Sequence, residues 1–133
     1  MEIKKINHIA VAVEDIGKAA DFWGNILGLP LDHIEEVQSQ HAKVAFFPCG
    51  DSEVELVQPT DAESGTARFL QSRGAGIHHL CLEVEDIEAA LAELKSKGVR
   101  LINETPLSEP GRKMAFIHPK SSGGVLLELY QVL

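Results

Sequence analysis

Residues 7–16 read Asn-His-Ile-Ala-Val-Ala-Val-Glu-Asp-Ile, and residues 78–87 read His-His-Leu-Cys-Leu-Glu-Val-Glu-Asp-Ile. The two stretches align His8 with His79, and both end on the run Val-Glu-Asp-Ile. An internal repeat of this kind indicates two copies of one supersecondary unit, each of which covers the apolar face of the other. The sequence therefore predicts a duplicated fold built around these two stretches.

A second matched segment follows each copy and carries one carboxylate. Residues 54–58 read Val-Glu-Leu-Val-Gln, and residues 127–131 read Leu-Glu-Leu-Tyr-Gln, so Glu55 aligns with Glu128. Since the histidines are matched as well, two imidazoles and two carboxylates occupy equivalent places in the two copies.

The composition fits one compact domain of ordinary globular type. The chain has 133 residues, of which 44% are hydrophobic and 24% charged, and its net charge is −8. Scattered basic residues and acidic balance argue against a nucleic-acid or anionic-membrane partner. No apolar stretch approaches the roughly 20 residues that span a bilayer, so we expect a cytoplasmic protein. Cys49 and Cys81 lack metal-site spacing, and we expect both to be small buried side chains without a disulfide.

In the first copy the alternation of Ile9, Val11 and Val13 predicts a strand, and Asp15 is placed to cap a helix that ends at Gly28. The residues expected on the buried stripe of that helix are apolar or small: Ile16, Ala19, Ala20, Phe22, Trp23, Ile26 and Leu27. Three extended runs follow, at residues 31–37, 42–47 and 53–57.

The second copy repeats this order. Leu80, Leu82 and Val84 predict a strand, Asp86 caps a helix that ends at Gly98, and extended runs are expected at residues 100–104, 113–117 and 125–130. Each copy is therefore predicted to form a βαβββ module. We place module one at residues 1–58, a connection with a short helix near residues 65–72 at 59–76, and module two at 77–133, all within a single domain.

The matched residues have the chemistry of a metal site. Imidazole nitrogen and carboxylate oxygen suit divalent ions such as Zn, Co, Ni, Mn or Fe(II), and two His with two Glu leave positions open on an octahedral ion. Taken singly, a strand histidine is more often a surface or core residue than a ligand. Glu55 between Val54 and Leu56 points opposite to its apolar neighbours, toward either solvent or a polar cavity. Recurrence in both copies favours a shared site.

Across essentially all of its length the chain resembles the vicinal oxygen chelate superfamily, whose paired βαβββ modules form a cupped mixed sheet around a divalent metal. Residues 69–79, Phe-Leu-Gln-Ser-Arg-Gly-Ala-Gly-Ile-His-His, and residues 118–129, His-Pro-Lys-Ser-Ser-Gly-Gly-Val-Leu-Leu-Glu-Leu, are similar to the methylmalonyl-CoA epimerases within it. The resemblance implies an α+β fold of this kind and an isomerase.

The resemblance also implies the ligand set: His8, Glu55, His79 rather than His78, and Glu128. Epimerases of this family often have Gln where this chain has Glu55, and two His with two Glu is the pattern of glyoxalase I. The final turn, His-Pro-Lys-Ser-Ser-Gly-Gly, differs from the Asp-Pro-Asp-Gly type common in glyoxalases. The cofactor implied is a divalent ion, namely Co, Mn, Zn or Ni.

The implied reaction is epimerisation of (2R)- and (2S)-methylmalonyl-CoA by removal of the α-proton, through an enolate that the metal stabilises. Inversion requires acid–base groups on both faces of the carbon, and Glu128 is the first candidate. The second acid–base group is unassigned. Some relatives carry Glu in the segment equivalent to residues 40–46, where this chain has Val44. The alternatives are Glu55 and His41, although a turn histidine such as His41 is more often merely exposed. Lys43 is expected to point the other way from Val44.

Four residues are candidates for binding the substrate carboxylate or the CoA phosphates, although solvated surface charge is an equal possibility for the cations: Gly111, Arg112, Lys113 and Lys120. The alternative functions are a glyoxalase I-type lactoylglutathione lyase, a ring-cleaving dioxygenase, and a non-catalytic module that binds a small molecule. The dioxygenase ranks low because its facial triad needs only one carboxylate. We expect a homodimer, to which the apolar end of the chain at residues 125–133 contributes.

Overall fold

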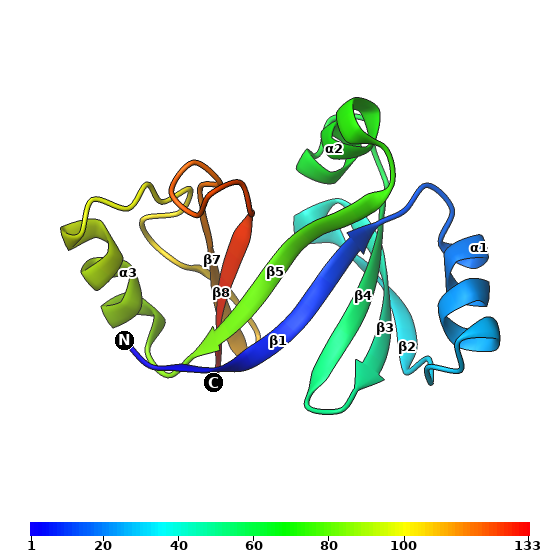
Figure 1. The fold of residues 1–133 in the computed structure, drawn as a ribbon, viewed down its shortest axis with the longest axis horizontal. Coiled ribbons are helices and arrows are strands. Elements are labelled where there is room, and N and C mark those ends of the chain that lie inside the picture. The colour runs from blue at the N-terminus through cyan, green and yellow to red at the C-terminus, as the bar shows by residue number, and fades with distance from the viewer. The chain divides into compact units, whose positions relative to one another are not determined.

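The computed structural model describes all residues 1–133 and contains the two βαβββ modules (Figure 1). The first consists of β1 (Ile3–Ala12), α1 (Ile16–Ala20) with its continuation η1 (Asp21–Ile26), β2 (His33–Val37), a short 3-10 turn η2 (Gln38–Gln40), β3 (Ala42–Cys49) and β4 (Ser52–Pro59). Helix α2 (Gly65–Arg73) follows it. The second consists of β5 (Gly76–Val84), α3 (Ile87–Ser96), β6 (Leu107–Glu109), β7 (Arg112–Ile117) and β8 (Leu127–Val132).

The chain divides into two compact units. The first unit comprises residues 8–78, and the second comprises residues 1–7 and 79–133. In the first unit β1 runs parallel to β4, and β4, β3 and β2 pair antiparallel in that order. In the second unit β5 runs parallel to β8, and β8, β7 and β6 pair antiparallel. Both units thus contain mixed sheets, and the α+β class and the duplicated βαβββ order are confirmed.

Each unit places one helix against one face of its sheet (Figure 1). Under α1 the core comprises Val13, Ile16, Ala45, Phe47 and Leu56. Under α3 the core comprises Val84, Ile87, Ala90, Leu91, Ala115, Ile117 and Leu129. Because strand side chains alternate between faces, the residues next to these core positions point to the opposite face. That opposite face carries the matched histidines and glutamates.

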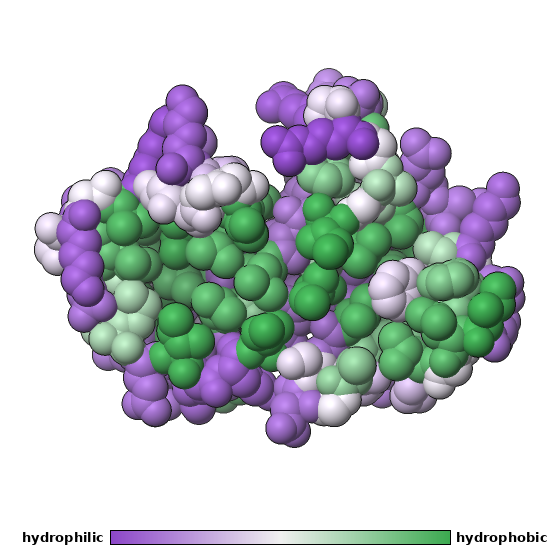
Figure 2. Space-filling view, viewed as in Figure 1, coloured by the Kyte–Doolittle hydropathy of each residue, from purple (hydrophilic) through white to green (hydrophobic).

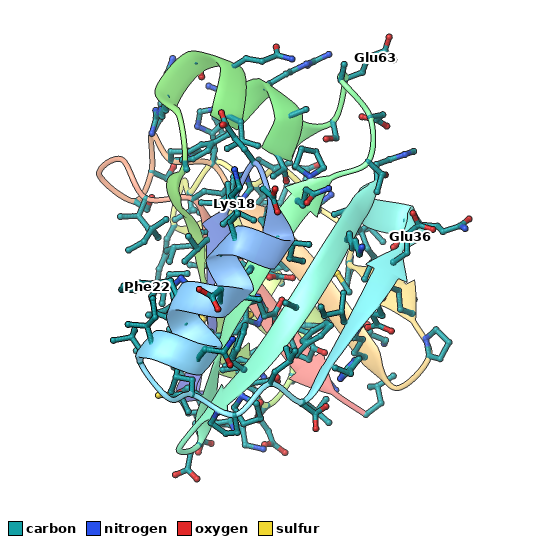
Figure 3. The ribbon with its side chains drawn as sticks, turned by 90° about the vertical axis from the view of Figure 1, so that its right-hand side faces the viewer. Lys18, Phe22, Glu36 and Glu63 are labelled. Carbon is teal, nitrogen blue, oxygen red and sulfur yellow. The ribbon has the colours of Figure 1, made fainter.

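The first helix ends differently from the expectation. Its last turn is π-helical, with the Leu27 amide donating to the Phe22 carbonyl at 2.9 Å. A wider turn rotates the following residues relative to an α-helical stripe. Trp23 still packs on the core, but Phe22, Ile26 and Leu27 are exposed, so the expectation that these three are buried is wrong. Figure 3 shows Phe22 on the outside of the helix, and Figure 2 shows apolar surface over this segment.

The expectation of a strand at residues 100–104 is also wrong. This segment makes a single bridge, from Leu101 to Ile117, and the strand that pairs with β7 is β6, further along the chain. The Asn103 side chain accepts from the Phe116 amide at 2.9 Å, so a side-chain oxygen takes the place of a ladder carbonyl. Pro106, which has no amide hydrogen, separates the segment from β6.

The cysteines form no disulfide, as expected. Cys81 is buried, but Cys49 is exposed at the end of β3, so the expectation that both are buried is wrong for Cys49. None of the helices has the length and apolarity that a membrane-crossing helix requires.

Leu56 gives a test of the core under α1. Its side chain is fully buried, and replacement by alanine leaves a cavity between sheet and helix. We expect Leu56→Ala to lower the free energy of unfolding by about 2–5 kcal/mol, measured by urea denaturation. The control is Ile26→Ala, which removes a side chain that is 67% exposed and should change stability by less than about 0.5 kcal/mol. Similar losses for both variants would contradict the packing described here.

Candidate metal and acid–base residues

In the first unit His8 and Glu55 form a buried imidazole–carboxylate pair. The parallel register of β1 and β4 sets Ala10 opposite Glu55 and His8 two residues away along the same face. His8 Nδ1 lies 3.1 Å from Glu55 Oε2, and the side chains are 5% and 15% exposed. Val54 and Leu56 on either side of Glu55 pack on the opposite face, toward α1. Strand alternation therefore places the carboxylate beside the imidazole.

The second unit repeats this arrangement with His79 and Glu128. Their atoms Nε2 and Oε1 lie 3.1 Å apart, and the side chains are 10% and 3% exposed. Cys81 lies opposite Glu128 in the parallel register of β5 and β8, as Ala10 lies opposite Glu55. The His79 ring also packs edge to face on Phe116, with centroids 5.5 Å apart.

The donor chemistry of these pairs fits a divalent cation. Each pair presents imidazole nitrogen and carboxylate oxygen from the inside of the protein, where a carboxylate needs a positive or hydrogen-bonding partner. Nitrogen and oxygen donors suit Zn, Co, Ni and Mn. The structure brings each histidine to the glutamate of its own copy; that both pairs bind one ion stays a prediction.

His78 is placed differently from His79, in agreement with the expectation that His79 rather than His78 is the ligand. It points to the other face of β5, is half-buried, and packs edge to face on Phe69 of α2 with ring centroids 5.0 Å apart. His79, by contrast, points to the face of Glu128 and contacts its carboxylate. The geometry favours His79 over His78 as a ligand.

Residues 40–46, the segment considered for the second acid–base group, contain no carboxylate. Val44 is buried, and Lys43 beside it is exposed. His41 lies in a left-handed turn, with a φ of 51°, and its side chain is 64% exposed and 3.1 Å from Asp61. His41 is thus the exposed turn residue that the sequence favours.

Arg112 has partners within the second unit. Its Nε donates to Glu109 at 2.8 Å, its Nη1 donates to the Tyr130 hydroxyl at 3.3 Å, and the guanidinium lies over the Tyr130 ring. Partial burial works against the charged form, but the hydrogen bonds to Glu109 and Tyr130 outweigh it and raise the pKa of Arg112. Arg112 is therefore a fixed cation on the same face of the sheet as Glu128.

The other three candidates differ in how they are held. Lys113 donates to Glu88 on α3, and this hydrogen bond lowers the pKa of the Glu88 carboxyl. Gly111 forms the turn before β7 with a φ of +80°, where an L side chain would be strained. Lys120 is exposed in the turn after β7.

The residues that share a face with the histidines differ between the units. In the first unit they form an apolar cluster of Ala10, Ala42, Val44 and Val57. In the second unit they include Glu83, which is buried and accepts from Asn7 at 3.0 Å. Sequence reasoning missed Glu83, although the alternation of His79, Cys81 and Glu83 along β5 could have indicated it.

The effect of the Lys120 charge can be measured through the pKa of the neighbouring His118. The Lys120 amide donates to His118 Nδ1 at 3.0 Å, and loss of solvation, followed by the charges of Arg100 and Lys120, lowers the pKa of His118. Removing one of those charges stabilises the imidazolium, so Lys120→Ala should raise the pKa of His118 in an NMR titration. Lys113→Ala should leave it unchanged, and a fall with Lys120→Ala would contradict the assignment.

A comparison of the two adjacent histidines tests the ligand set. We expect His79→Ala to lose bound Co²⁺ after loading and gel filtration, because the pair with Glu128 is broken, while His78→Ala retains it. Metal content is measured by atomic emission, and circular dichroism verifies that both variants are folded. Equal loss of metal in the two variants would show that the register of the ligands is wrong.

The comparisons with known proteins agree with this arrangement. Residues 7–116 match the family model described as the Glyoxalase/Bleomycin resistance protein/Dioxygenase superfamily. The human protein "Methylmalonyl-CoA epimerase, mitochondrial" is 40% identical over 129 residues, covering 96% of this chain and 73% of that protein. The "Ethylmalonyl-CoA/methylmalonyl-CoA epimerase" of Cereibacter sphaeroides is 38% identical, with 98% of this chain and 99% of that protein covered.

A solved structure described as methylmalonyl-CoA epimerase in complex with methylmalonyl-CoA and NH4+ superposes with a TM-score of 0.90 and 29% identity. The superposition covers 98% of this chain and 96% of that one. Sequence similarity and fold thus agree over nearly the whole chain. This chain belongs to the methylmalonyl-CoA epimerase family of the glyoxalase, bleomycin resistance protein and dioxygenase superfamily.

Proposed function

We propose that this protein is an isomerase that interconverts (2R)- and (2S)-methylmalonyl-CoA with the help of a divalent cation. The observation that carries the proposal is the pair of buried imidazole–carboxylate contacts, His8 with Glu55 and His79 with Glu128, in a member of the epimerase family. A duplicated set of ionisable groups at low exposure needs a chemical reason, because burial of such groups is costly.

Four residues would hold the cation: His8, Glu55, His79 and Glu128. When bound, a divalent ion such as Co, Mn, Zn or Ni supplies Lewis-acid stabilisation of negative charge on the oxygens of the substrate. The ion would also offset the unfavourable field that a chain of net charge −8 presents to an anionic thioester.

Glu128 is proposed to move the proton at C2 of the substrate. Its side chain is the less exposed of the two glutamates, at 3% against 15% for Glu55, and His79 Nε2 lies 3.1 Å from its Oε1. Return of a proton on the opposite face needs a second acid–base group or water. Glu55 is the candidate for this role that the repeat supports, since His41 is exposed and paired with Asp61.

The substrate's carboxylate and CoA phosphates are proposed to contact Gly111, Arg112, Lys113 and Lys120. Arg112 supports this best, because Glu109 and Tyr130 fix the orientation of its guanidinium, and a planar guanidinium suits carboxylate and phosphate groups. Lys120 is exposed, whereas Lys113 would have to exchange Glu88 for the substrate.

We further propose a homodimer in the cytoplasm. Exposed apolar residues lie near the end of the chain and would contribute to the interface: Val125, Val132 and Leu133. Neither cysteine forms a disulfide, as is usual for a reducing compartment.

One observation favours a second candidate. Glu55 completes the two-His, two-Glu set typical of glyoxalase I, so lactoylglutathione lyase activity belongs in the test. A non-catalytic binding module is a third possibility, but it has no need of four ionisable groups at these positions.

The decisive experiment follows hydrogen exchange at C2. One epimer of methylmalonyl-CoA is incubated with the protein in D2O, with and without a chelator, and C2–H is followed by NMR. We expect exchange and racemisation that stop when the chelator is added. Absence of exchange, together with turnover of the methylglyoxal–glutathione adduct, would establish the glyoxalase function instead, and ligand binding by a metal-free protein without turnover would establish the binding module.

Glu128→Gln tests the acid–base role. The substitution keeps the shape of a buried side chain but removes the group that accepts a proton. We expect exchange at C2 to fall by at least about 100-fold, the size of effect usual for a general acid or base. His78→Ala is the matched control and should have a milder effect. Exchange by Glu128→Gln at the rate of the unchanged protein would exclude Glu128 as the base.

A further inference from the structure

Two glutamines join the strands that carry the glutamates to the first residues of the helices. In the first unit the Ile16 amide donates to Gln58 Oε1 at 2.8 Å. In the second unit the Ile87 amide donates to Gln131 Oε1 at 2.9 Å. Ile16 and Ile87 are the first residues of α1 and α3, so each glutamine satisfies an amide that has no partner within its helix.

These contacts are additional to the ordinary caps of the same helices. The Asp15 side chain accepts from the Lys18 amide at 3.1 Å, and the Asp86 side chain accepts from the Ala89 amide at 3.1 Å. Each helix start therefore has one acceptor from its own chain segment and one from a strand. We call the second contact the glutamine clamp: Gln58 with Ile16, and Gln131 with Ile87.

The clamp closes a ring of contacts around each His–Glu pair. In the first unit the ring passes from His8 along the chain to Ile16, across the hydrogen bond to Gln58, back along β4 to Glu55, and across the 3.1 Å contact to His8. The second unit has the same ring through His79, Ile87, Gln131 and Glu128. Glutamate and glutamine stand three residues apart and so point to opposite faces of their strand.

Comparison of the two copies shows which residues these rings need. Within residues 54–58 and 127–131 the copies share only glutamate, leucine and glutamine, while Val57 is replaced by Tyr130. The shared leucines, Leu56 and Leu129, belong to the helix-side cores. The glutamine is therefore common to both copies on strands whose neighbouring side chains have diverged.

We infer that Gln58 and Gln131 are positioning residues that hold Glu55 and Glu128 beside their histidines, by preventing the glutamate strands from shifting along β1 and β5. A shift of one residue would turn each glutamate to the helix face, and smaller displacements would lengthen the contact with the imidazole. This inference rests on the proposed function, because it assigns the glutamines to the proposed metal ligands.

The test compares the two acceptors at one helix start. Gln58→Asn keeps an amide but is shorter by one methylene and cannot reach Ile16 in the same way; Gln58→Glu keeps both the reach and an acceptor oxygen. Asp15→Ala removes the other acceptor of α1 without touching β4. Affinity for Co²⁺ is measured by competition with a chromophoric chelator, and folding is verified by urea denaturation.

We expect Gln58→Asn to weaken Co²⁺ binding by about tenfold or more, as is usual for residues that orient metal ligands. Gln58→Glu should restore affinity to within about threefold, and Asp15→Ala should leave it within the same range despite a loss of stability. Equal weakening by Gln58→Asn and Asp15→Ala, or no weakening by Gln58→Asn, would overturn the inference. If Gln58→Asn does not fold, Gln131→Asn with Asp86→Ala provides the same comparison in the second unit.

A second measurement separates this inference from the proposed function. If the unchanged protein binds no Co²⁺, the proposed function fails, and the clamp is then tested on the metal-free protein through the NMR resonances of the His8 ring and the Glu55 amide. Displacement of both resonances by Gln58→Asn, but not by Asp15→Ala, supports the positioning role. Unchanged resonances overturn it.

Discussion

The structure depends on a constraint of strand geometry: a carboxylate and its apolar neighbours point to opposite faces of the same strand. Leu56 and Leu129 are buried under helices, so Glu55 and Glu128 must lie on the other face of the strand. On that face a carboxylate oxygen of each glutamate lies 3.1 Å from a ring nitrogen of His8 or His79. The hydrophobic cores thus set the direction of the ionisable groups. Burial then makes each carboxylate dependent on its imidazole, because an isolated buried charge is costly.

The two units share one framework because the sequence is duplicated, but the side chains around their histidines have diverged. Both copies keep the histidine, the glutamate, the helix cap and the glutamine clamp. On the face of the histidines, however, the first unit has an apolar cluster with Val44 and Val57, while the second has Arg112 with Tyr130. The faces that carry the histidines therefore differ in polarity between the two units.

Much of this could be predicted from the sequence. The repeat, the strand alternation and the capping residues Asp15 and Asp86 indicate the duplicated βαβββ order, and His79 is distinguished from His78 by alignment alone. The exposure of Ile26 and Leu27 could not be predicted, because the π-helical turn that rotates them depends on the hydrogen bond from the Leu27 amide to the Phe22 carbonyl, which the spacing of apolar residues does not indicate. The strand expected at residues 100–104 is wrong for a similar reason, since the Asn103 side chain takes the place of a backbone partner of Phe116 there.

By itself, the sequence determined the duplication, the identity of the paired histidines and glutamates, and the membership of a family, because these follow from residue types at matched spacings. Only the tertiary structure decided which groups touch: each histidine meets the glutamate of its own copy, Arg112 is held by Glu109 and Tyr130, and Gln58 reaches the amide of Ile16. Apart from Arg112 and Glu109, which are three positions apart, these contacts join residues 18 or more positions apart in the chain. They depend on strand register and helix placement, which the packing of the core fixes and local sequence does not.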